Sequence, residues 1–359
     1  MSVLKLSAQS VRALRWLKLP LWVLALATGA KSFKDNPVIG SARLNRAGLH
    51  ISRMRLAHRL AAWRRRRLAD GIDPADRAAF DRDGYIIKPD FLPAEVFASI
   101  QAELNGFRGH TREMLQGDTI TRRIALDVDS LKQLPCTRGV LDGRPWRALL
   151  DYVGSYRLHP LHYVQIILSH VRDAAPDPQT TLHADTFHPT VKAWLFLTDV
   201  AEDEGPFVYV PGSHRLTKRR LAWERRRSIG AAQSDRLSAR GSLRITPGEI
   251  DRLGYPAPRA FAVRGNTLVV ADTSGFHARG PSVRPSVRIE LWAYGRRNPF
   301  FPWTGWHLEG LPGLRGRIVP LYWRALDVME RCGITRNPWR PSTATIADSL
   351  QEHKNGNKK

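Results

Sequence analysis

The chain has 359 residues, of which 43% are hydrophobic and 25% charged, a composition typical of globular proteins and unlike that of disordered chains. Its formal net charge is +23, and its two cysteines, Cys136 and Cys332, are too few and too far apart for a disulfide framework or a cysteine-based metal site. This cysteine usage favours a reducing compartment, so we expect a cytoplasmic protein.

Residues 1–72 form a basic, partly apolar segment. Residues 1–70 carry 15 Lys or Arg against two Asp, a net charge of +13. Residues 19–30 are an apolar run, too short to cross a bilayer, which needs about 20 residues. We favour an interfacial contact with an anionic membrane, at its inner face; a docked helix and a secretory signal are the alternatives. At residues 44–68, apolar residues at helical spacing alternate with arginines, which predicts a basic helix, either solvated or lying on anionic lipid.

From residue 73 the pattern becomes that of a folded domain. Asp73 and Pro74 are typical of a helix start, as capping residue and first-turn proline, and Gly84 ends that helix. A short strand is expected at residues 85–88, and another helix begins near residue 93.

Beyond residue 160 the signals are mainly those of β-strands separated by turn residues. The expected strands are residues 161–168, 191–198, 207–210, 260–263, 267–270 and 287–294. A basic, helical insertion at residues 214–245 interrupts them. This pattern predicts a mainly β fold with flanking α-helices, arranged as an antiparallel barrel or jelly roll. We expect the domain to span residues 73–300 and to be followed by a C-terminal extension, residues 301–359, that is disordered at its end.

Two potential metal ligands, His183 and Asp185, are separated by one residue. On an extended strand, residues two apart point to the same side, so this imidazole and this carboxylate project into one space. Together they make two thirds of a facial triad for iron(II), which leaves three coordination positions open. His277, which follows an apolar strand and a glycine, is the strongest candidate for the third ligand, and His188 is its competitor.

An arginine that follows His277 by 11 residues makes the pattern more specific. Arg288 begins a strand, and its planar guanidinium can bind a carboxylate through two hydrogen bonds. The far carboxylate of 2-oxoglutarate needs such a partner when its keto-acid end chelates iron. Arg284 is the alternative for this role.

The order of these motifs resembles that of the phytanoyl-CoA dioxygenase family. The resemblance covers about residues 76–296, and its central block ends in a Pro-Gly-Ser-His turn. Four stretches carry it: residues 80–87, 183–185, 193–214 and 265–288. It implies a double-stranded β-helix (jelly-roll or cupin-like) core and a dioxygenase that binds iron(II) and 2-oxoglutarate, consumes O2 and releases succinate and CO2.

The resemblance also implies roles for individual residues. His183, Asp185 and His277 would hold the metal at the catalytic centre. Four further residues would contact 2-oxoglutarate: Arg288, Trp194, Lys192 and Gln165. The family often has a small hydroxyl residue two positions after its distal histidine, where this chain has Arg279, so we expect a differently arranged cosubstrate pocket.

Hydroxylation of an unactivated C–H bond is the expected reaction. The apolar, basic N-terminal segment favours an acyl or lipid substrate, and a small soluble metabolite is the alternative. A basic nucleic-acid-binding β protein without oxygenase activity is a hypothesis of another class. Nucleic acid is not expected as a partner, because the central block resembles the phytanoyl branch.

Overall fold

The structure is a computed structural model that describes residues 18–356 except residues 158, 306–310, 312 and 315. The strands are β1 (Tyr85–Lys88), β2 (Thr111–Gln116), β3 (Thr119–Ala125), β4 (Leu161–Ser169), β5 (Val191–Phe196), β6 (Phe207–Tyr209), β7 (Arg259–Phe261), β8 (Leu268–Asp272), β9 (His277–Arg279), β10 (Ser286–Gly295) and β11 (Arg340–Ser342). The helices are α2 (Ala42–Arg46), α3 (Leu49–Leu68), α4 (Pro74–Asp83), α5 (Ala94–Asn105), α6 (Pro135–Asp142), α7 (Arg144–Gly154), α8 (Lys218–Gly230), α9 (Arg236–Ala239), α10 (Pro247–Leu253), α11 (Ile318–Arg331) and α12 (Ile346–Gly356).

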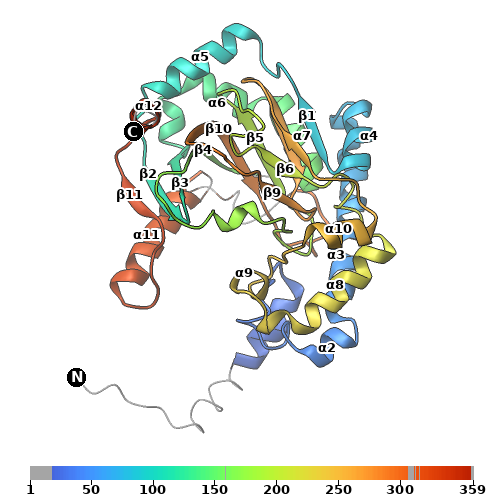
Figure 1. Ribbon diagram of the computed structural model, residues 1–359. Helices are drawn as coiled ribbons and strands as arrows, with labels where there is room; N and C mark the ends of the chain where they lie inside the picture. Colours follow the sequence, from blue (N-terminus) through green and yellow to red (C-terminus); the bar gives the residue numbers. More distant parts are fainter. Residues whose placement is uncertain (1–17, 158, 306–310, 312, 315, 357–359) are drawn as a thin grey trace, which may run out of the picture.

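Two antiparallel sheets, flanked by helices, form the centre of the molecule (Figure 1). The large sheet has the order β1-β8-β5-β10-β4-β3-β2-β11, and the small sheet has the order β7-β6-β9. Helices α5, α6, α7 and α12 contribute to the apolar core on the outer face of the large sheet. The predicted double-stranded β-helix with flanking helices is thereby confirmed.

Alternation along the central strands separates this outer core from the space between the sheets. On β5, Val191, Ala193 and Leu195 lie fully buried in the core that the helices cover. Lys192 and Trp194 therefore point the other way, toward the small sheet, because successive side chains of a strand face opposite sides. Burying a side chain such as Leu195 stabilises the fold by about 1.5–3 kcal/mol.

All six strands predicted beyond residue 160 are present, with ends that differ by up to two residues. Strand β1 also lies where it was predicted. The structure adds β2, β3, β9 and β11, which the sequence pattern did not predict. Two of these, β2 and β3, widen the large sheet on the side where β11 forms its edge.

The predicted basic helix is present as α3, but a wholly solvated or lipid-bound helix is the wrong description of it. Arg64 is only 1% exposed and donates hydrogen bonds to the carbonyl oxygens of Ser155 and Phe301, at 3.0 and 2.7 Å. Burial lowers the pKa of Arg64 to about 10. On the opposite side of α3, Arg55 and Arg59 are exposed. Some of the arginines of α3 therefore hold the helix against the domain, because their guanidinium groups donate to backbone carbonyl oxygens that loops leave free.

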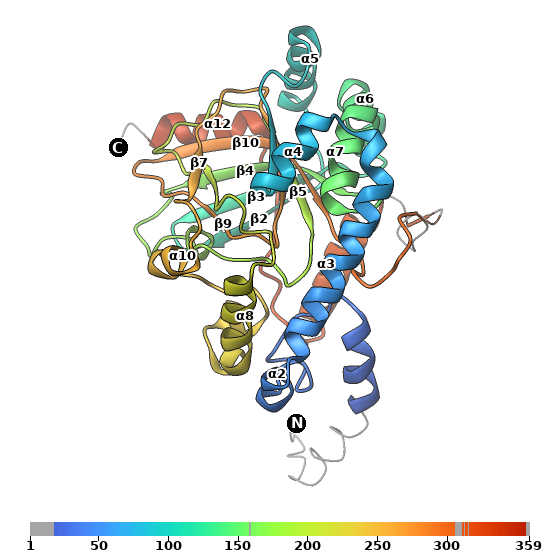
Figure 2. The same cartoon turned by 90° about the vertical axis from the view of Figure 1, so that its right-hand side faces the viewer.

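Residues 18–24 form a short helix ahead of α2 (Figure 2). Its apolar side chains are largely uncovered: Leu21 and Leu24 are 65% and 66% exposed. Within the described residues, no helix combines the length and the apolar composition that crossing a bilayer requires.

Helices also occupy the insertion and the C-terminal extension. The insertion at residues 214–245 contains α8 and α9, and α8 packs against α2 and α3. The extension returns to the domain: β11 pairs with β2, and Trp323 of α11 is buried beside Tyr163 of β4, with the ring centroids 6.1 Å apart. The disorder expected at the chain end falls on residues 357–359, outside the described residues.

Candidate metal centre

Backbone pairing brings the three predicted ligands together. His183 and His277 exchange two N–H···O bonds of 2.9 Å in an antiparallel bridge, and the Asp185 N–H donates to the Thr273 carbonyl oxygen at 2.9 Å. His277 begins β9 of the small sheet, whereas His183 lies in an irregular segment and not on the regular strand that the spacing suggested. A segment about 90 residues distant in the chain is therefore placed directly beside the His183–Asp185 pair.

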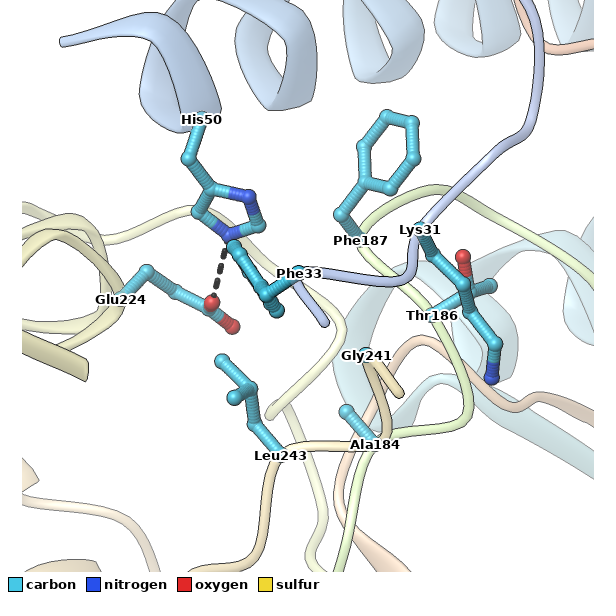
Figure 3. A pocket seen from close by; sticks show the side chains of 9 residues that line it. All are labelled: Lys31, Phe33, His50, Ala184, Thr186, Phe187, Glu224, Gly241 and Leu243. Carbon is cyan, nitrogen blue, oxygen red and sulfur yellow. Dashed lines mark hydrogen bonds and ion pairs between the residues drawn. The ribbon is translucent and has the colours of Figure 1, made fainter. Parts of the chain in front are cut away.

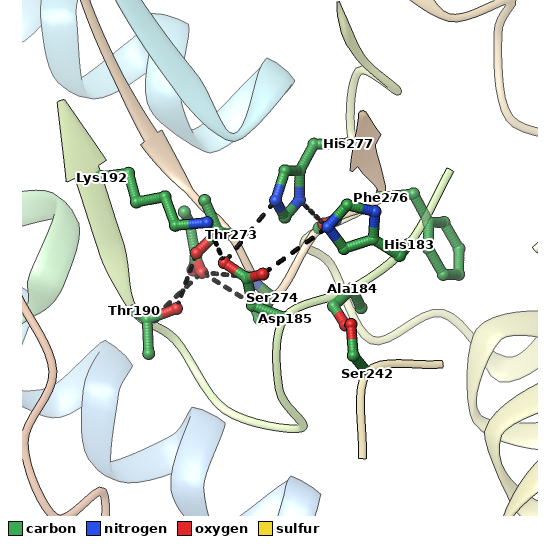
Figure 4. A network of polar contacts seen from close by, with 12 residues as sticks. His183, Ala184, Asp185, Thr190, Lys192, Ser242, Thr273, Ser274, Phe276 and His277 are labelled. Atoms are coloured by element: carbon green, nitrogen blue, oxygen red, sulfur yellow. Dashed lines mark hydrogen bonds and ion pairs between the residues drawn. The ribbon is translucent and has the colours of Figure 1, made fainter. Parts of the chain in front are cut away.

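The ligand atoms of these residues converge (Figure 4). One ligand atom from each of His183, Asp185 and His277 lies within 4.8 Å of the others. The Nε2 atoms of His183 and His277 are 3.7 and 3.6 Å from the two carboxylate oxygens of Asp185. Two imidazoles and one carboxylate in this arrangement suit a divalent transition metal.

The histidine tautomers are fixed by the backbone. His183 Nδ1 lies 2.8 Å from the Thr181 carbonyl oxygen, and His277 Nδ1 lies 3.0 Å from that of Gly275. Because a carbonyl oxygen can only accept a hydrogen bond, each Nδ1 carries the proton. Each Nε2 therefore presents its lone pair to the centre, as metal ligation requires.

The protonation states also suit metal ligation. Burial lowers the pKa of His183 well below its ordinary value, with His277 adding to the effect, and burial lowers the pKa of His277 to about 4. Burial alone would raise the pKa of Asp185, but Lys192, His277 and His183 together outweigh it and hold that pKa well below its ordinary value. Two neutral imidazoles and an ionised carboxylate therefore face one another at neutral pH.

The triad lies in the wall of a cavity with an empty volume of about 730 Å³. The four residues predicted to contact a cosubstrate, Arg288, Trp194, Lys192 and Gln165, line the same cavity. Their strands are neighbours in the large sheet, since β10 lies between β4 and β5. The sequence prediction thus named residues that the fold brings together.

Arg288 and Lys192 are both held by carboxylates. Arg288 Nε lies 2.9 Å from a carboxylate oxygen of the fully buried Glu290, and its Nη1 donates to the Gly205 carbonyl oxygen. Lys192 Nζ lies 2.6 Å from Asp185 Oδ2. Arg288 also lines the cavity, so the part of its guanidinium that these contacts leave free can bind an incoming carboxylate.

The competing candidates lie elsewhere. His188 is fully buried, but among the described residues the only metal-competent cluster is the one that His183, Asp185 and His277 form. Arg284 is 56% exposed and pairs with Asp203 and Glu204, so it does not reach the cavity. These positions exclude His188 as a ligand of this centre and Arg284 as its carboxylate partner.

The cavity also contains residues whose role the sequence did not reveal. Arg279, at the position where a hydroxyl residue was expected, lines the cavity and pairs with the buried Asp177 at 2.7 Å. Arg123 and Trp292 form another part of the wall. The alternation of β3 could have pointed to Arg123, but only if β3 had first been predicted as a strand.

The N-terminal segment lies directly behind the metal-ligand loop (Figure 3). Lys31 donates a hydrogen bond from Nζ to the backbone carbonyl oxygen of Asp185, and burial lowers the pKa of Lys31 to about 8. In the same small cavity, His50 of α3 lies 2.9 Å from Glu224 of α8. The basic segment therefore supports the candidate metal centre from behind.

A family model described as phytanoyl-CoA dioxygenase matches residues 80–252, which include the His183–Asp185 pair. The chain belongs to the phytanoyl-CoA dioxygenase family. Membership of the phytanoyl-CoA dioxygenase family makes it a 2-oxoglutarate-dependent dioxygenase that uses iron, and it sets aside the hypothesis of a nucleic-acid-binding protein without oxygenase activity.

Individual proteins are also similar to this chain in sequence or in structure. The ectoine dioxygenase of Halomonas elongata is 26% identical over 255 residues, which cover 64% of this chain and 72% of that protein. The epimerase SnoN, solved with Fe3+, alpha-ketoglutarate and nogalamycin RO, has a TM-score of 0.44 at 21% identity, covering 67% of this chain and 92% of its own. HygX from Streptomyces hygroscopicus, solved with nickel, 2-oxoglutarate and hygromycin B, has a TM-score of 0.40 at 17% identity, covering 68% and 95%.

The side chains of this member of the phytanoyl-CoA dioxygenase family fit the iron that the family uses. Within the described part of the chain, His277 Nε2 is buried without a hydrogen-bond partner. A buried polar atom left in this way is costly to the fold, and a metal ion at the centre would satisfy it. The donor set of two nitrogens and one carboxylate is that of non-haem iron(II) oxygenases.

Proposed function

We propose that this enzyme hydroxylates a C–H bond of a small, polar metabolite. The polar wall of the triad cavity carries this proposal. Besides the metal ligands, the wall contains the following charged, amide and hydroxyl side chains: Gln116, Thr121, Arg123, Gln165, Gln179, Lys192, Arg279 and Arg288. An acyl chain packed against this wall would remove water from these polar groups without offering them hydrogen bonds, which costs free energy.

Similarity to a known protein points the same way. The similarity to an ectoine dioxygenase adds support, because ectoine is a small metabolite. We therefore favour the metabolite over the acyl or lipid substrate that the N-terminal segment suggested.

The proposed roles follow from the positions of the side chains. His183, Asp185 and His277 hold iron(II) through Nε2 and carboxylate oxygens, and Arg288 binds the far carboxylate of 2-oxoglutarate. Trp194 contributes an apolar wall, with its ring 4.2 Å from that of Phe207. Lys192 and Gln165 orient neighbouring carboxylates, those of Asp185 and Glu290.

Iron(II) and 2-oxoglutarate, once bound, supply the oxidative chemistry, in which O2 and 2-oxoglutarate yield succinate, CO2 and one oxygen atom for the substrate C–H bond. The chain itself contributes position and charge. Arg288 fixes one end of the cosubstrate, and the backbone carbonyls of Thr181 and Gly275 keep both imidazoles turned toward the centre. Trp194 and Phe207 exclude water from one side of the site.

The reaction class is tested without knowledge of the substrate. Purified protein supplied with iron(II), O2 and 2-oxoglutarate should form succinate slowly, because members of this class turn over the cosubstrate even when no substrate is bound. His183→Ala should remove this activity and leave the circular dichroism spectrum unchanged. A folded wild-type protein that forms no iron-dependent succinate would refute the proposed function.

We also propose that the helix at residues 18–24 contacts an anionic membrane surface. Leu21, Val23 and Leu24 are exposed, and the exposed arginines Arg55 and Arg59 of α3 add positive charge. Apolar side chains combined with basic ones favour binding to acidic lipid headgroups. Sedimentation with phosphatidylserine vesicles should be lost when all three apolar residues are replaced by serine. Equal sedimentation of both proteins would refute this contact.

A further inference from the structure

Four cationic side chains line the cavity, and three of them are paired with carboxylates of the chain. Lys192 pairs with Asp185, Arg279 with Asp177 and Arg288 with Glu290, at 2.6, 2.7 and 2.9 Å. The fourth is Arg123, and within the described residues no carboxylate lies within ion-pair distance of it. A cation that is mostly withdrawn from water favours a negative partner.

The guanidinium of Arg123 is fixed on one edge only. Its Nε donates a 2.9 Å hydrogen bond to Gln165 Oε1, which is a neutral amide. The structure gives neither Nη atom a hydrogen bond to any residue that it describes. Because a guanidinium can present two N–H groups in parallel to a carboxylate, the Nη1–Nη2 edge of Arg123 is left as an open fork.

Aromatic rings hold this fork in place. The Arg123 Cζ atom lies 4.3 Å from the ring centroid of Trp292 and 4.9 Å from that of Trp339. Trp339 belongs to the C-terminal extension and immediately precedes β11. Arg112 of β2 donates to the Trp339 carbonyl oxygen at 3.1 Å and also pairs with Asp327 of α11. The extension therefore packs against the Arg123 guanidinium and helps to hold it in place.

We propose that Arg123 binds a carboxylate group of the substrate and thereby selects anionic small metabolites. This inference rests on the proposed function, since it assigns a substrate class to the same cavity. Arg288 binds the far carboxylate of 2-oxoglutarate, so the cosubstrate and the substrate each have their own arginine. Trp292 and Trp339 hold the Arg123 guanidinium in position for the incoming carboxylate and shield the resulting ion pair from water.

The test uses defined carboxylates and their neutral counterparts. The full chain is loaded with Zn(II) and saturating 2-oxoglutarate, which occupies the metal and Arg288 and prevents turnover. Acetate, butyrate, cyclopentanecarboxylate and benzoate are then titrated, each against its carboxamide, by ligand-observed NMR. We expect at least one carboxylate to bind roughly tenfold more tightly than its amide, the value typical of charge-assisted hydrogen bonds.

Three variants assign this preference to the residue. Arg123→Gln should reduce the preference to about twofold or less, and Arg123→Lys should keep part of it, since lysine retains the charge without the planar fork. Arg138→Gln, on the exposed surface of α6, is the matched control and should leave the preference unchanged. Retained Zn(II) and 2-oxoglutarate binding verifies that each variant is folded. If Arg123→Gln does not fold, the test rests on Arg123→Lys, which should show a smaller carboxylate preference than the wild-type protein.

Two results would overturn the inference. The first is a wild-type protein that binds no carboxylate more tightly than its amide, or that binds neither series. The second is a carboxylate preference that is as large in the Arg123 variants as in the wild-type protein. These results leave the proposed function untouched, because iron-dependent succinate formation is measured without any substrate. Conversely, absence of succinate together with a carboxylate preference at Arg123 would reject the oxygenase function and retain the anion site.

Discussion

Polar side chains of the cavity wall and the buried Glu290 form a continuous series of ion pairs and hydrogen bonds. Arg288 pairs with Glu290, Glu290 accepts a 2.6 Å hydrogen bond from Gln165 Nε2, and Gln165 accepts one from Arg123. Glu290 is completely buried, so its charge depends on these partners. These contacts link the proposed cosubstrate arginine on β10 to the proposed substrate arginine on β3 through Gln165 of β4, which lies between the two strands.

We predict that Arg288→Lys raises the KM for 2-oxoglutarate about tenfold to a hundredfold. The substitution keeps the charge opposite Glu290 but loses the planar pair of donors, which is worth roughly 1.5–3 kcal/mol. Succinate formation measured against 2-oxoglutarate concentration checks this. Arg284→Lys is the control, since Arg284 is exposed and lies outside the cavity. A KM that rises in the Arg284 variant instead would mean that Arg284 holds the cosubstrate.

At the scale of elements, the N-terminal segment and the metal-ligand loop act together. Lys31 donates to the carbonyl oxygen of Asp185, and Arg53 of α3 holds the residues before it by donating to the carbonyl oxygens of Leu26, Thr28 and Ala30. The basic segment thus helps to hold the loop that carries the metal ligands, whether or not the same segment also contacts a membrane. A residue that orients a metal ligand in this way typically affects metal affinity.

We predict that Lys31→Met weakens iron(II) binding roughly tenfold, a magnitude typical of residues that orient ligands. The substitution removes the hydrogen bond to Asp185 and retains most of the apolar stem. Lys34→Met is the matched control, because Lys34 is exposed in the same segment. Metal affinity measured by competition with a chelator distinguishes them. Equal affinity of the two variants would show that the segment packs behind the loop without orienting it.

The strands that the sequence predicted are those whose core-facing side chains are apolar. Strand β5 is an example, because Val191, Ala193 and Leu195 all enter the outer core. Strand β3 was missed, because its inward residues include Thr121 and Arg123, so its two faces differ little in polarity. A strand that lines a polar cavity loses the pattern by which strands are predicted.

The site was predicted better than the elements around it. His277 was found through its order in the family motif and its distance from Arg288, and no local pattern in the three-residue strand β9 would have identified it. Arg123 and Trp339 lie in segments that this motif does not include. Their proximity depends on the pairing of β11 with β2, which short sequence patterns do not encode.

At the scale of the whole molecule, buried neutral histidines outside the triad connect its layers. His188 is completely buried after the metal-ligand loop, and His214, in the turn after β6, packs against Phe80 of α4 with the ring centroids 5.2 Å apart. Burial lowers the pKa of His188 well below its ordinary value and that of His214 to about 3. Both imidazoles are therefore neutral in the folded protein over the whole physiological pH range.

We predict that the metal-free protein loses stability as the pH falls below about 6.5. The unfolded chain binds protons on these histidines near pH 6.5, whereas the folded chain binds none on His214 until about pH 3. Below pH 6.5 the unfolded state thus holds more protons, and each such histidine lowers the free energy of unfolding by about 1.4 kcal/mol per pH unit. The stability is complete above pH 6.5 and decreases progressively down to about pH 3.

Urea unfolding in the presence of a chelator, followed from pH 7 to pH 4, measures this slope. His214→Gln should make the slope shallower by about 1.4 kcal/mol per pH unit, because one group no longer takes up a proton on unfolding. His110→Gln is the matched control for the loss of an imidazole, because His110 lies exposed at the surface. If both variants retained the wild-type slope, His214 would have to be protonated in the folded protein, and its burial against Phe80 would not determine the acid stability of the fold.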